Sequence, residues 1–188
     1  MPEKVLEGEL LGNRVMFWGK DALELYDESG YGKPLPEEEP DRVELDILEA
    51  AYLLEKARIK VFVKEDGKKK KVEFDDLMSI GTKNVNAFHT SYIVFRDLRE
   101  RGYVIKTGFK FGTVFRVYER GVKLRRGPKA VHEHTKWLVQ PVAEESPFSL
   151  PEMSRAVRLA HNIRATFIWA VVDKESDVTY YHIQRITP

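Results

Sequence analysis

Residues 92–118 read YIVFRDLRERGYVIKTGFKFGTVFRVY, and this stretch decides the fold of the C-terminal half of the chain. Large apolar side chains recur every three or four positions from Phe88, just before this stretch, through Tyr92, Phe95 and Leu98 within it. This spacing predicts a helix over residues 86–101 with one buried stripe, ended by Gly102. Residues 103–119 are rich in β-branched and aromatic side chains, which predicts strands. The stretch therefore predicts a helix that leads directly into a β-sheet.

Toward the C-terminus the same sheet is predicted to continue. Residues 136–142 have the pattern of a strand. A helix is expected to begin at Ser149-Leu150-Pro151-Glu152, because the first helical turn does not need the N–H that proline lacks, and to end near Asn162. An apolar strand over residues 166–173 and a last strand over residues 178–186 follow.

The N-terminal half has a different pattern. The first thirty residues are predicted to form short strands, with a Gly-Asn hairpin turn between residues 6–11 and 14–18. Residues 31–40 contain three prolines and are predicted to form a loop. A helix is expected to open at Asp41. Its apolar face would consist of Val43, Ile47, Ala51 and Leu54.

A strand over residues 59–63 is predicted to lead through a turn into four consecutive lysines, residues 68–71. A run of like charges is typical of a solvated hairpin end, and a loop that contacts RNA is the alternative. Asp75 or Asp76 is then expected to cap a short helix.

These patterns predict an α+β, or mixed α/β, protein with two domains. The first is a small α+β domain over residues 1–83. The second, residues 84–188, is a mixed sheet flanked by helices.

Composition excludes several classes of protein. The 188 residues include no cysteine, so disulfides, zinc fingers and thiolate catalysis are excluded. Lys and Arg number 31 against 30 Asp and Glu, so any nucleic-acid contact must use local positive charge rather than net charge. No apolar run reaches the length of a membrane span and no signal-peptide core is visible, so we expect a cytoplasmic protein without membrane contact.

Familiar catalytic motifs are missing, and no cofactor is predicted. His132-Glu133-His134 places two imidazoles on one side of an extended segment, but no third ligand accompanies them, so no metal site is predicted. Tyr118 ends one predicted strand and His134 precedes the next. The basic loop between them includes Arg125 and Arg126. Because a strand–loop–strand connection brings its ends together, Tyr118 and His134 are predicted to share a site rimmed by cations.

Such a pair suits the cleavage of RNA without a metal. The RNA 2′-hydroxyl can attack the adjacent phosphate if a base takes its proton and an acid protonates the departing 5′-oxygen. Histidine titrates near neutrality and suits the role of acid. Tyrosine acts as a base only where nearby cations lower its pKa, and the alternative for Tyr118 is a half-buried strand aromatic.

The segments around these residues closely resemble the catalytic domain of the archaeal tRNA-splicing endonucleases. The resemblance begins in residues 92–112 and continues through Phe115-Arg116-Val117-Tyr118 and His134-Thr135-Lys136-Trp137-Leu138-Val139. Further similar stretches are residues 48–54, 157–164 and 170–173, together with Tyr180-Tyr181. The resemblance thus covers nearly the whole chain and identifies residues 84–188 as a nuclease domain.

The resemblance implies a substrate and a reaction. The substrate would be precursor tRNA, cut at the bulge–helix–bulge of its exon–intron junctions without a metal. The products would be 2′,3′-cyclic phosphate and 5′-hydroxyl ends. The family uses a Tyr, His and Lys triad, in which Tyr118 matches the proposed general base and His134 the proposed general acid.

The third position departs from the family pattern, because Ala165 stands where the resemblance places the lysine. Three explanations are open. The chain is a variant inactivated by a change of lysine to alanine, it is a non-catalytic structural subunit of a heteromeric enzyme, or another cation does the work. Arg164 could replace the lysine only if the helix end were turned, because neighbours on a helix point in different directions.

The resemblance also implies RNA contacts and an assembly. Arg158 and Arg185 match arginines that hold a bulge base by cation–π contact, although an ion pair on the helix surface is the alternative for Arg158. The last strand and the acidic loop at residues 173–177 resemble the family's assembly contacts, which implies a homotetramer. An RNA-binding module without chemistry is a further alternative.

Overall fold

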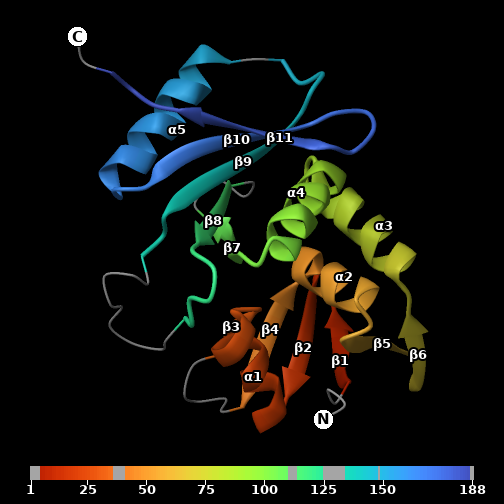
Figure 1. The fold of residues 1–188 in the computed structure, drawn as a ribbon. Helices are drawn as coiled ribbons and strands as arrows, with labels where there is room; N and C mark the ends of the chain where they lie inside the picture. Colours follow the sequence, from red (N-terminus) through yellow and green to blue (C-terminus); the bar gives the residue numbers. More distant parts are fainter. Residues whose placement is uncertain (1–4, 36–40, 110–113, 125–133, 148, 187–188) are drawn as a thin grey trace. The chain divides into compact units, whose positions relative to one another are not determined.

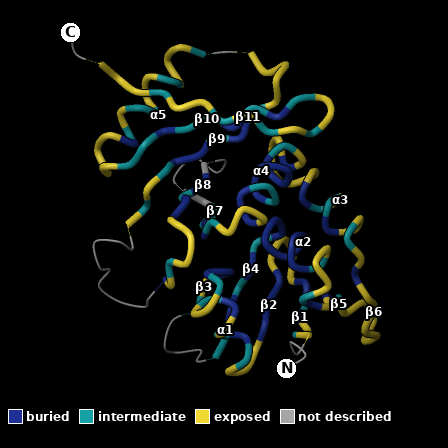
Figure 2. The backbone as a smooth tube through the Cα atoms, in the orientation of Figure 1, coloured by how far each residue is buried: buried dark blue, intermediate teal, exposed yellow. Residues whose placement is uncertain are grey.

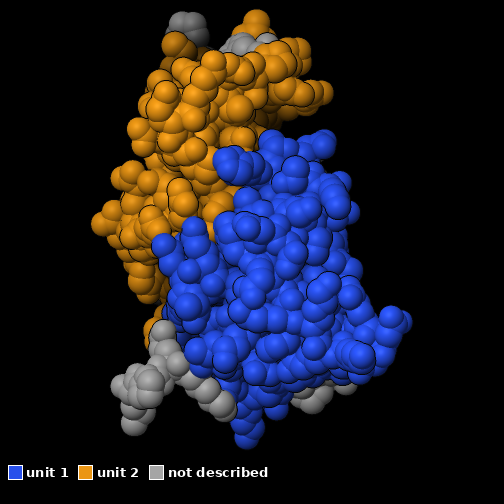
Figure 3. Space-filling model, turned by 90° about the vertical axis from the view of Figure 1, so that its right-hand side faces the viewer, with its two compact units in different colours: residues 1–89 blue, residues 90–188 orange. Residues whose placement is uncertain are grey.

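The computed structural model describes residues 5–35, 41–109, 114–124, 134–147 and 149–186. The chain divides into two compact units, residues 1–89 and residues 90–188, which Figure 3 distinguishes by colour. Each unit contains one mixed β-sheet with its own helices, so the predicted α+β class is confirmed.

The sheet of the first unit has the strand order β3-β4-β2-β1-β5-β6 (Figure 1). Its strands are β1 (Leu6–Leu11), β2 (Arg14–Trp18), β3 (Lys33–Pro34), β4 (Arg42–Asp46), β5 (Ile59–Glu65) and β6 (Lys68–Val72). The pair β1 and β5 is parallel, and the other described pairs are antiparallel. The predicted hairpin between β1 and β2 is confirmed.

The described residues of this unit form the helices α1 (Lys20–Ser29), α2 (Ile47–Glu55) and α3 (Phe74–Asn84). Seven consecutive residues of α2, from Ile47 to Leu53, are buried. They include Glu49, whose carboxylate accepts a hydrogen bond of 3.1 Å from the Gly32 N–H. This helix is therefore the centre of the first core.

Two predictions for this unit are wrong. Residues 20–29 form helix α1 rather than a continuation of short strands. Their pattern hid the helix, because only Ala22 and Leu25 are buried and Gly19 provides no side-chain cap. The helix predicted from Asp41 begins at Ile47, and the preceding residues form strand β4, in which Val43 pairs with Phe17.

Two smaller details also differ from the predictions. Within the loop predicted for residues 31–40, Lys33–Pro34 pairs with β4 as the short strand β3. Residues 36–40 lie outside the described residues. Helix α3 begins after Glu73 rather than after an aspartate cap, and Asp76 accepts a hydrogen bond of 2.9 Å from the Glu73 N–H.

The sheet of the second unit has the order β11-β10-β9-β8-β7. Its elements are α4 (Phe88–Glu100), β7 (Val104–Phe109), β8 (Val114–Tyr118), β9 (Trp137–Ala143), α5 (Leu150–Asn162), β10 (Thr166–Val172) and β11 (Val178–Ile183). Helix α5 connects the parallel pair β9 and β10, and the other pairs are antiparallel. The predicted mixed sheet, with a helix before it and one inserted in it, is confirmed.

Alternation along the strands gives this sheet two faces. On one face Phe115 of β8 meets Phe95 of α4 edge-on, with ring centroids 6.0 Å apart. On the other face Leu138 of β9 and Phe167 of β10 pack with Ala160 of α5. Apolar side chains therefore cover both faces of the sheet near its middle. Polar functional groups are accordingly expected at the ends of the strands.

Candidate active site

Tyr118 lies at the end of β8, directly across from the segment that enters β9. Val117 is paired with Trp137, so the next residues outward in this antiparallel pair are Tyr118 and Lys136. The Lys136 N–H donates a hydrogen bond of 3.0 Å to the Val117 carbonyl. His134 is exposed and lies two residues before Lys136. The register thus places Tyr118 and the His134 segment at the same end of the sheet.

Ala165, the residue before β10, lies at the same end of the sheet. Trp137 is paired in parallel with Thr166, so the residues one position earlier, Lys136 and Ala165, are neighbours. The Lys136 carbonyl accepts a hydrogen bond of 2.9 Å from the Thr166 N–H. Three residues therefore form one line across three strands, and we call Tyr118, Lys136 and Ala165 the site row.

The members of the site row differ in exposure. The Tyr118 side chain is 1% exposed, so its ring is enclosed in the free chain. Ala165 is partly buried and packs against the apolar cluster of Leu138, Ala160 and Phe167. A methyl group at this position fills apolar space and supplies no charge. The Lys136 side chain, by contrast, is 49% exposed.

Aromatic rings and cations gather next to the site row. The Trp137 ring meets the Tyr103 ring edge-on, with centroids 5.5 Å apart. The Arg120 guanidinium lies over the Tyr103 ring at 4.9 Å, and the Lys136 ammonium lies 4.9 Å from the Trp137 ring. The same ammonium is hydrogen-bonded to the Glu119 carboxylate. Such cation–π contacts hold positive charge at this end of the sheet.

Neither Lys136, which belongs to the site row, nor its ion-pair partner Glu119 stands out in the sequence as a functional residue. Lys136 stands within residues 134–139, one of the segments that carry the family resemblance, but both are charged residues of a kind common on surfaces. The signal that identifies them is the register of β8 with β9 and of β9 with β10, which sequence patterns do not specify.

The predicted RNA-contacting arginines are spread over several elements. Arg158 is exposed on α5, and Arg185 is exposed just beyond β11. Because Ile183 pairs with Phe167, the end of β11 lies beside the start of β10, which is the end of the sheet that carries the site row. Arg125 and Arg126 lie outside the described residues, as does His132 of the His-Glu-His motif.

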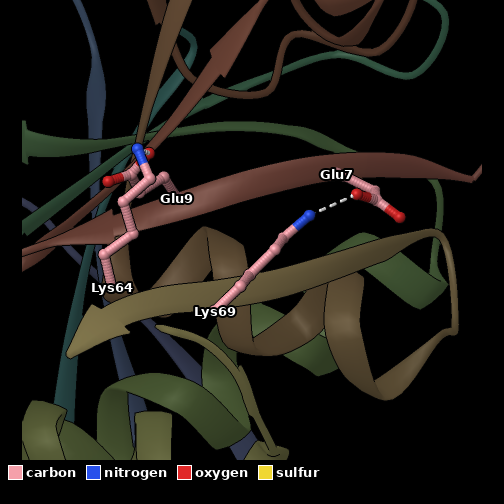
Figure 4. A network of polar contacts seen from close by, with 4 residues as sticks. All are labelled: Glu7, Glu9, Lys64 and Lys69. Carbon is pink, nitrogen blue, oxygen red and sulfur yellow. Dashed lines mark hydrogen bonds and ion pairs between the residues drawn. The ribbon is translucent and has the colours of Figure 1, made fainter. Parts of the chain in front are cut away.

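The four lysines at residues 68–71 form the exposed strand β6, so the predicted solvated hairpin end is confirmed. Figure 4 shows Lys69 of β6 with Glu7 and Lys64 of β5 with Glu9, at 2.7 Å and 2.8 Å. Lys71 lies 2.6 Å from Glu73. These carboxylates offset much of the positive charge, and a lysine-rich edge strand also resists pairing with another sheet. The alternative of an RNA-contacting loop receives no support from this arrangement.

A second polar cluster ties α4 to the edge strand β11. The Tyr180 hydroxyl donates a hydrogen bond of 2.5 Å to Asp97, and Arg101 binds both oxygens of the same carboxylate at 2.7 Å and 3.0 Å. Burial alone would raise the pKa of Asp97, but the hydrogen bonds from Arg101 and Tyr180 outweigh it and hold the pKa below its ordinary value. Burial and the neighbouring carboxylate raise the pKa of Tyr180 far above its ordinary value.

Within the described ranges, no three acidic or histidine side chains come together as a metal site would require. Nor does any helix in the described part of the chain have the length and apolar character to cross a membrane.

Comparison with protein families identifies both halves of the chain. Residues 6–78 match the tRNA intron endonuclease N-terminal domain, and residues 88–180 match the tRNA intron endonuclease catalytic C-terminal domain. The resemblance drawn from the sequence motifs is confirmed by these two matches.

Individual relatives agree with the family models. A tRNA-splicing endonuclease of Thermococcus kodakarensis is 39% identical over 178 residues, which cover 94% of this chain and 96% of the relative. One from Pyrococcus horikoshii is 37% identical over 185 residues, 98% of each chain. A tRNA-splicing endonuclease of Methanosarcina mazei is 36% identical over 186 residues, which cover 98% of this chain but 49% of the longer relative. The chain belongs to the tRNA intron endonuclease family.

Proposed function

We propose that this chain is a tRNA-splicing endonuclease subunit that cleaves precursor tRNA at the bulge–helix–bulge of its exon–intron junctions. The reaction needs no metal and leaves 2′,3′-cyclic phosphate and 5′-hydroxyl ends. Family membership and the names of the relatives support the substrate class. The observation that carries the proposal is the strand register that gathers Tyr118, the His134 segment and Ala165 at one end of the sheet.

The chemistry divides among these residues by type. Tyr118, as the phenolate, takes the proton from the 2′-hydroxyl, and the protonated imidazole of His134 gives a proton to the departing 5′-oxygen. The five-coordinate phosphorane between these steps carries negative charge that a fixed cation stabilises. Ala165 cannot fill that third role, because its side chain is a single methyl group.

The enclosed ring of Tyr118 adds a requirement for substrate binding. A general base must come within hydrogen-bond reach of the proton that it accepts, and catalytic contacts often tighten only in the substrate complex. Since the Tyr118 side chain is 1% exposed in the free chain, RNA binding must uncover its hydroxyl before the 2′-hydroxyl can reach it.

Recognition and assembly complete the proposal. Arg158 and Arg185 stack on unpaired bulge bases, because guanidinium planes grip splayed RNA bases well. Arg125 and Arg126 contact the RNA backbone and make binding salt-dependent. A homotetramer supplies two active sites in fixed register, which allows both junctions of one precursor to be cut.

The test uses the Ala165→Lys variant, which supplies a cation at the third position. This variant, incubated with EDTA and a precursor tRNA that carries a bulge–helix–bulge, should cut both junctions. In this background Tyr118→Phe and His134→Ala should each lower the single-turnover rate by about 10²–10⁴-fold, the usual contribution of an acid or base. Tyr26→Phe in α1 and His89→Ala at the start of α4 serve as matched controls. An Ala165→Lys variant that binds the RNA but never cuts it alone contradicts the proposal.

A second candidate function is that of a non-catalytic structural subunit in a heteromeric splicing endonuclease. The observation that favours it is the apolar packing of Ala165 against Leu138, Ala160 and Phe167. Under this hypothesis neither this chain nor its Ala165→Lys variant cuts until a catalytic partner is added. Tyr118→Phe would then leave the rate of the mixture unchanged.

A further inference from the structure

We propose that Lys136 is a catalytic residue that supplies the cation which the site lacks at Ala165. The inference rests on the proposed function and names the residue that stabilises the phosphorane in that reaction. Lys136 is the middle member of the site row, with Tyr118 on one side and Ala165 on the other. Both of its backbone hydrogen-bonding groups are engaged with the flanking strands, to Val117 and Thr166. Its Cα is therefore fixed at the centre of the predicted chemistry.

Reach favours this assignment. Adjacent strands lie about 4.8 Å apart, so Lys136 is one strand spacing from the residues on either side. The four-carbon lysine stem is longer than that spacing and turns about several bonds. An ammonium carried from position 136 can thus enter the space that an ammonium carried from position 165 would occupy.

The present partner of Lys136 does not prevent this movement. Its ammonium is paired with Glu119, the residue after Tyr118, and the two side chains are 49% and 51% exposed. Ion pairs between such half-exposed side chains are weak, because water competes for both charges. A dianionic phosphorane next to Tyr118 is a stronger attractor than one carboxylate, so the ammonium exchanges Glu119 for the reacting phosphate.

The reaction balances with Lys136 in this role. The 2′-oxygen forms a bond to phosphorus while its proton passes to the Tyr118 phenolate, and the bond from phosphorus to the 5′-oxygen breaks as the protonated imidazole of His134 gives that oxygen a proton. Lys136 transfers no proton. It stays charged throughout and lowers the energy of the phosphorane, which is a transition-state effect.

Two other cations near the site are less well placed. Arg164 adopts a left-handed backbone conformation, with φ of 56°, in the turn between α5 and β10, one position outside the site row. Arg185 lies two residues beyond Ile183, the last paired residue of β11, and on the far side of β10 from Tyr118. Lys136 is the cation whose backbone adjoins both Tyr118 and Ala165.

The test compares four chains: the unsubstituted chain, Lys136→Ala, Ala165→Lys, and the double variant. Single-turnover cleavage of a bulge–helix–bulge precursor is measured with EDTA present, with the dissociation constant for the same RNA measured alongside. We expect Lys136→Ala to slow cleavage about 100-fold or more, as loss of one charge-stabilising group does. The dissociation constant should change less than threefold, because the contact forms in the transition state. The double variant should recover the rate of Ala165→Lys.

Controls separate this role from a structural one. Glu119→Gln breaks the same ion pair but keeps the ammonium, so its rate should stay within threefold of the natural chain. Lys64→Ala removes a comparable lysine–glutamate pair in the first unit and should have no effect. The inference is overturned if Lys136→Ala cleaves at the rate of the unsubstituted chain. It is also overturned if Glu119→Gln loses as much activity as Lys136→Ala.

The remaining outcomes distinguish the two proposals. If Ala165→Lys cleaves and the unsubstituted chain does not, Lys136 does not supply the cation, while the proposed function stands. If Ala165→Lys does not cleave either, the proposed function fails and this inference fails with it.

Discussion

Helices α2 and α5 each lead into a strand of the parallel pair in their own sheet. Most residues of α2 are buried, whereas most residues of α5 are exposed or partly exposed. Seven consecutive residues of α2 are buried, whereas Ala160 is the buried residue of α5. Figure 2 shows α2 dark blue over most of its length and α5 mostly teal and yellow. Arg155, Arg158 and His161 are among the exposed side chains of α5.

This difference separates stability from function. A helix that is apolar on every side has no surface for a ligand, so its sequence is constrained by packing. A helix that buries a narrow stripe keeps most of its surface for polar contacts. We therefore expect substitutions in α2 to lower the free energy of unfolding and substitutions on the exposed side of α5 to affect RNA binding. Four substitutions test this comparison, from the largest expected effect on stability to the smallest.

Leu53→Ala should have the largest effect. Leu53 is fully buried in α2, and truncation of such a side chain removes apolar contacts and leaves a cavity, which costs about 2–5 kcal/mol. Urea unfolding followed by circular dichroism measures the loss. Leu150→Ala is the matched control, because Leu150 at the start of α5 is 64% exposed. If the two variants lost equal free energy of unfolding, the burial of each helix would not determine how much it contributes to stability.

Asp46→Ala should have the next largest effect. The Asp46 carboxylate accepts a hydrogen bond of 2.8 Å from the Glu49 N–H at the start of α2, and loss of such a cap costs about 1 kcal/mol. Ser149 occupies the equivalent position before α5 but makes no side-chain capping bond. Ser149→Ala should therefore leave the unfolding midpoint unchanged, and an equal shift would contradict the assignment of the two caps.

The same two helices show how far sequence patterns lead. The α5 boundaries, the β1–β2 hairpin and the strands of the second sheet were predictable, because their apolar spacing and turn residues are local signals. The start of α2 was missed because Val43 and Ile47 fit a helical spacing, although they belong to different elements. Asp46 with Glu49 is a capping box, and this was the available signal for the true start.

The candidate site was predictable in part. Tyr118 and His134 stand out by residue type and by their places at predicted strand ends. The place of Lys136 between Tyr118 and Ala165 depends on pairing among three strands that are far apart in the sequence, and register of that kind follows from tertiary contacts. The near-complete burial of Tyr118 was also beyond prediction, since strand alternation does not say how completely a face is covered.

Helix α4 provides an intermediate case, because charge as well as apolar packing fastens it to its sheet. The pKa of Asp97 is lowered in the folded chain from an ordinary value of 3.8, so the carboxylate contributes stability that is fully present above that pH and is lost as the pH falls through the lowered value. Asp97→Asn should therefore destabilise the chain at pH 6. The difference from the natural chain should shrink between pH 4 and pH 2.

Urea unfolding at several pH values measures this dependence. Glu24→Gln on α1 is the control, because Glu24 is an exposed helix carboxylate in the first unit. A stability difference for Asp97→Asn that stays constant with pH would mean that the side chain acts through shape rather than charge.

Arg158→Ala should have the smallest effect on stability and the clearest effect on RNA. Arg158 is exposed on α5, so its removal should change the free energy of unfolding by less than about 0.5 kcal/mol.

Two possible contacts of Arg158 with the RNA make different predictions for binding. If the guanidinium stacks on a bulge base, Arg158→Lys loses nearly as much affinity as Arg158→Ala, because an ammonium has no plane to stack. If it contacts a phosphate, Arg158→Lys keeps most of the affinity, and Arg158→Ala lowers the slope of log affinity against log salt by about one. Titration of precursor tRNA at several salt concentrations decides between them, and a large loss of stability in either variant would break the comparison between α2 and α5.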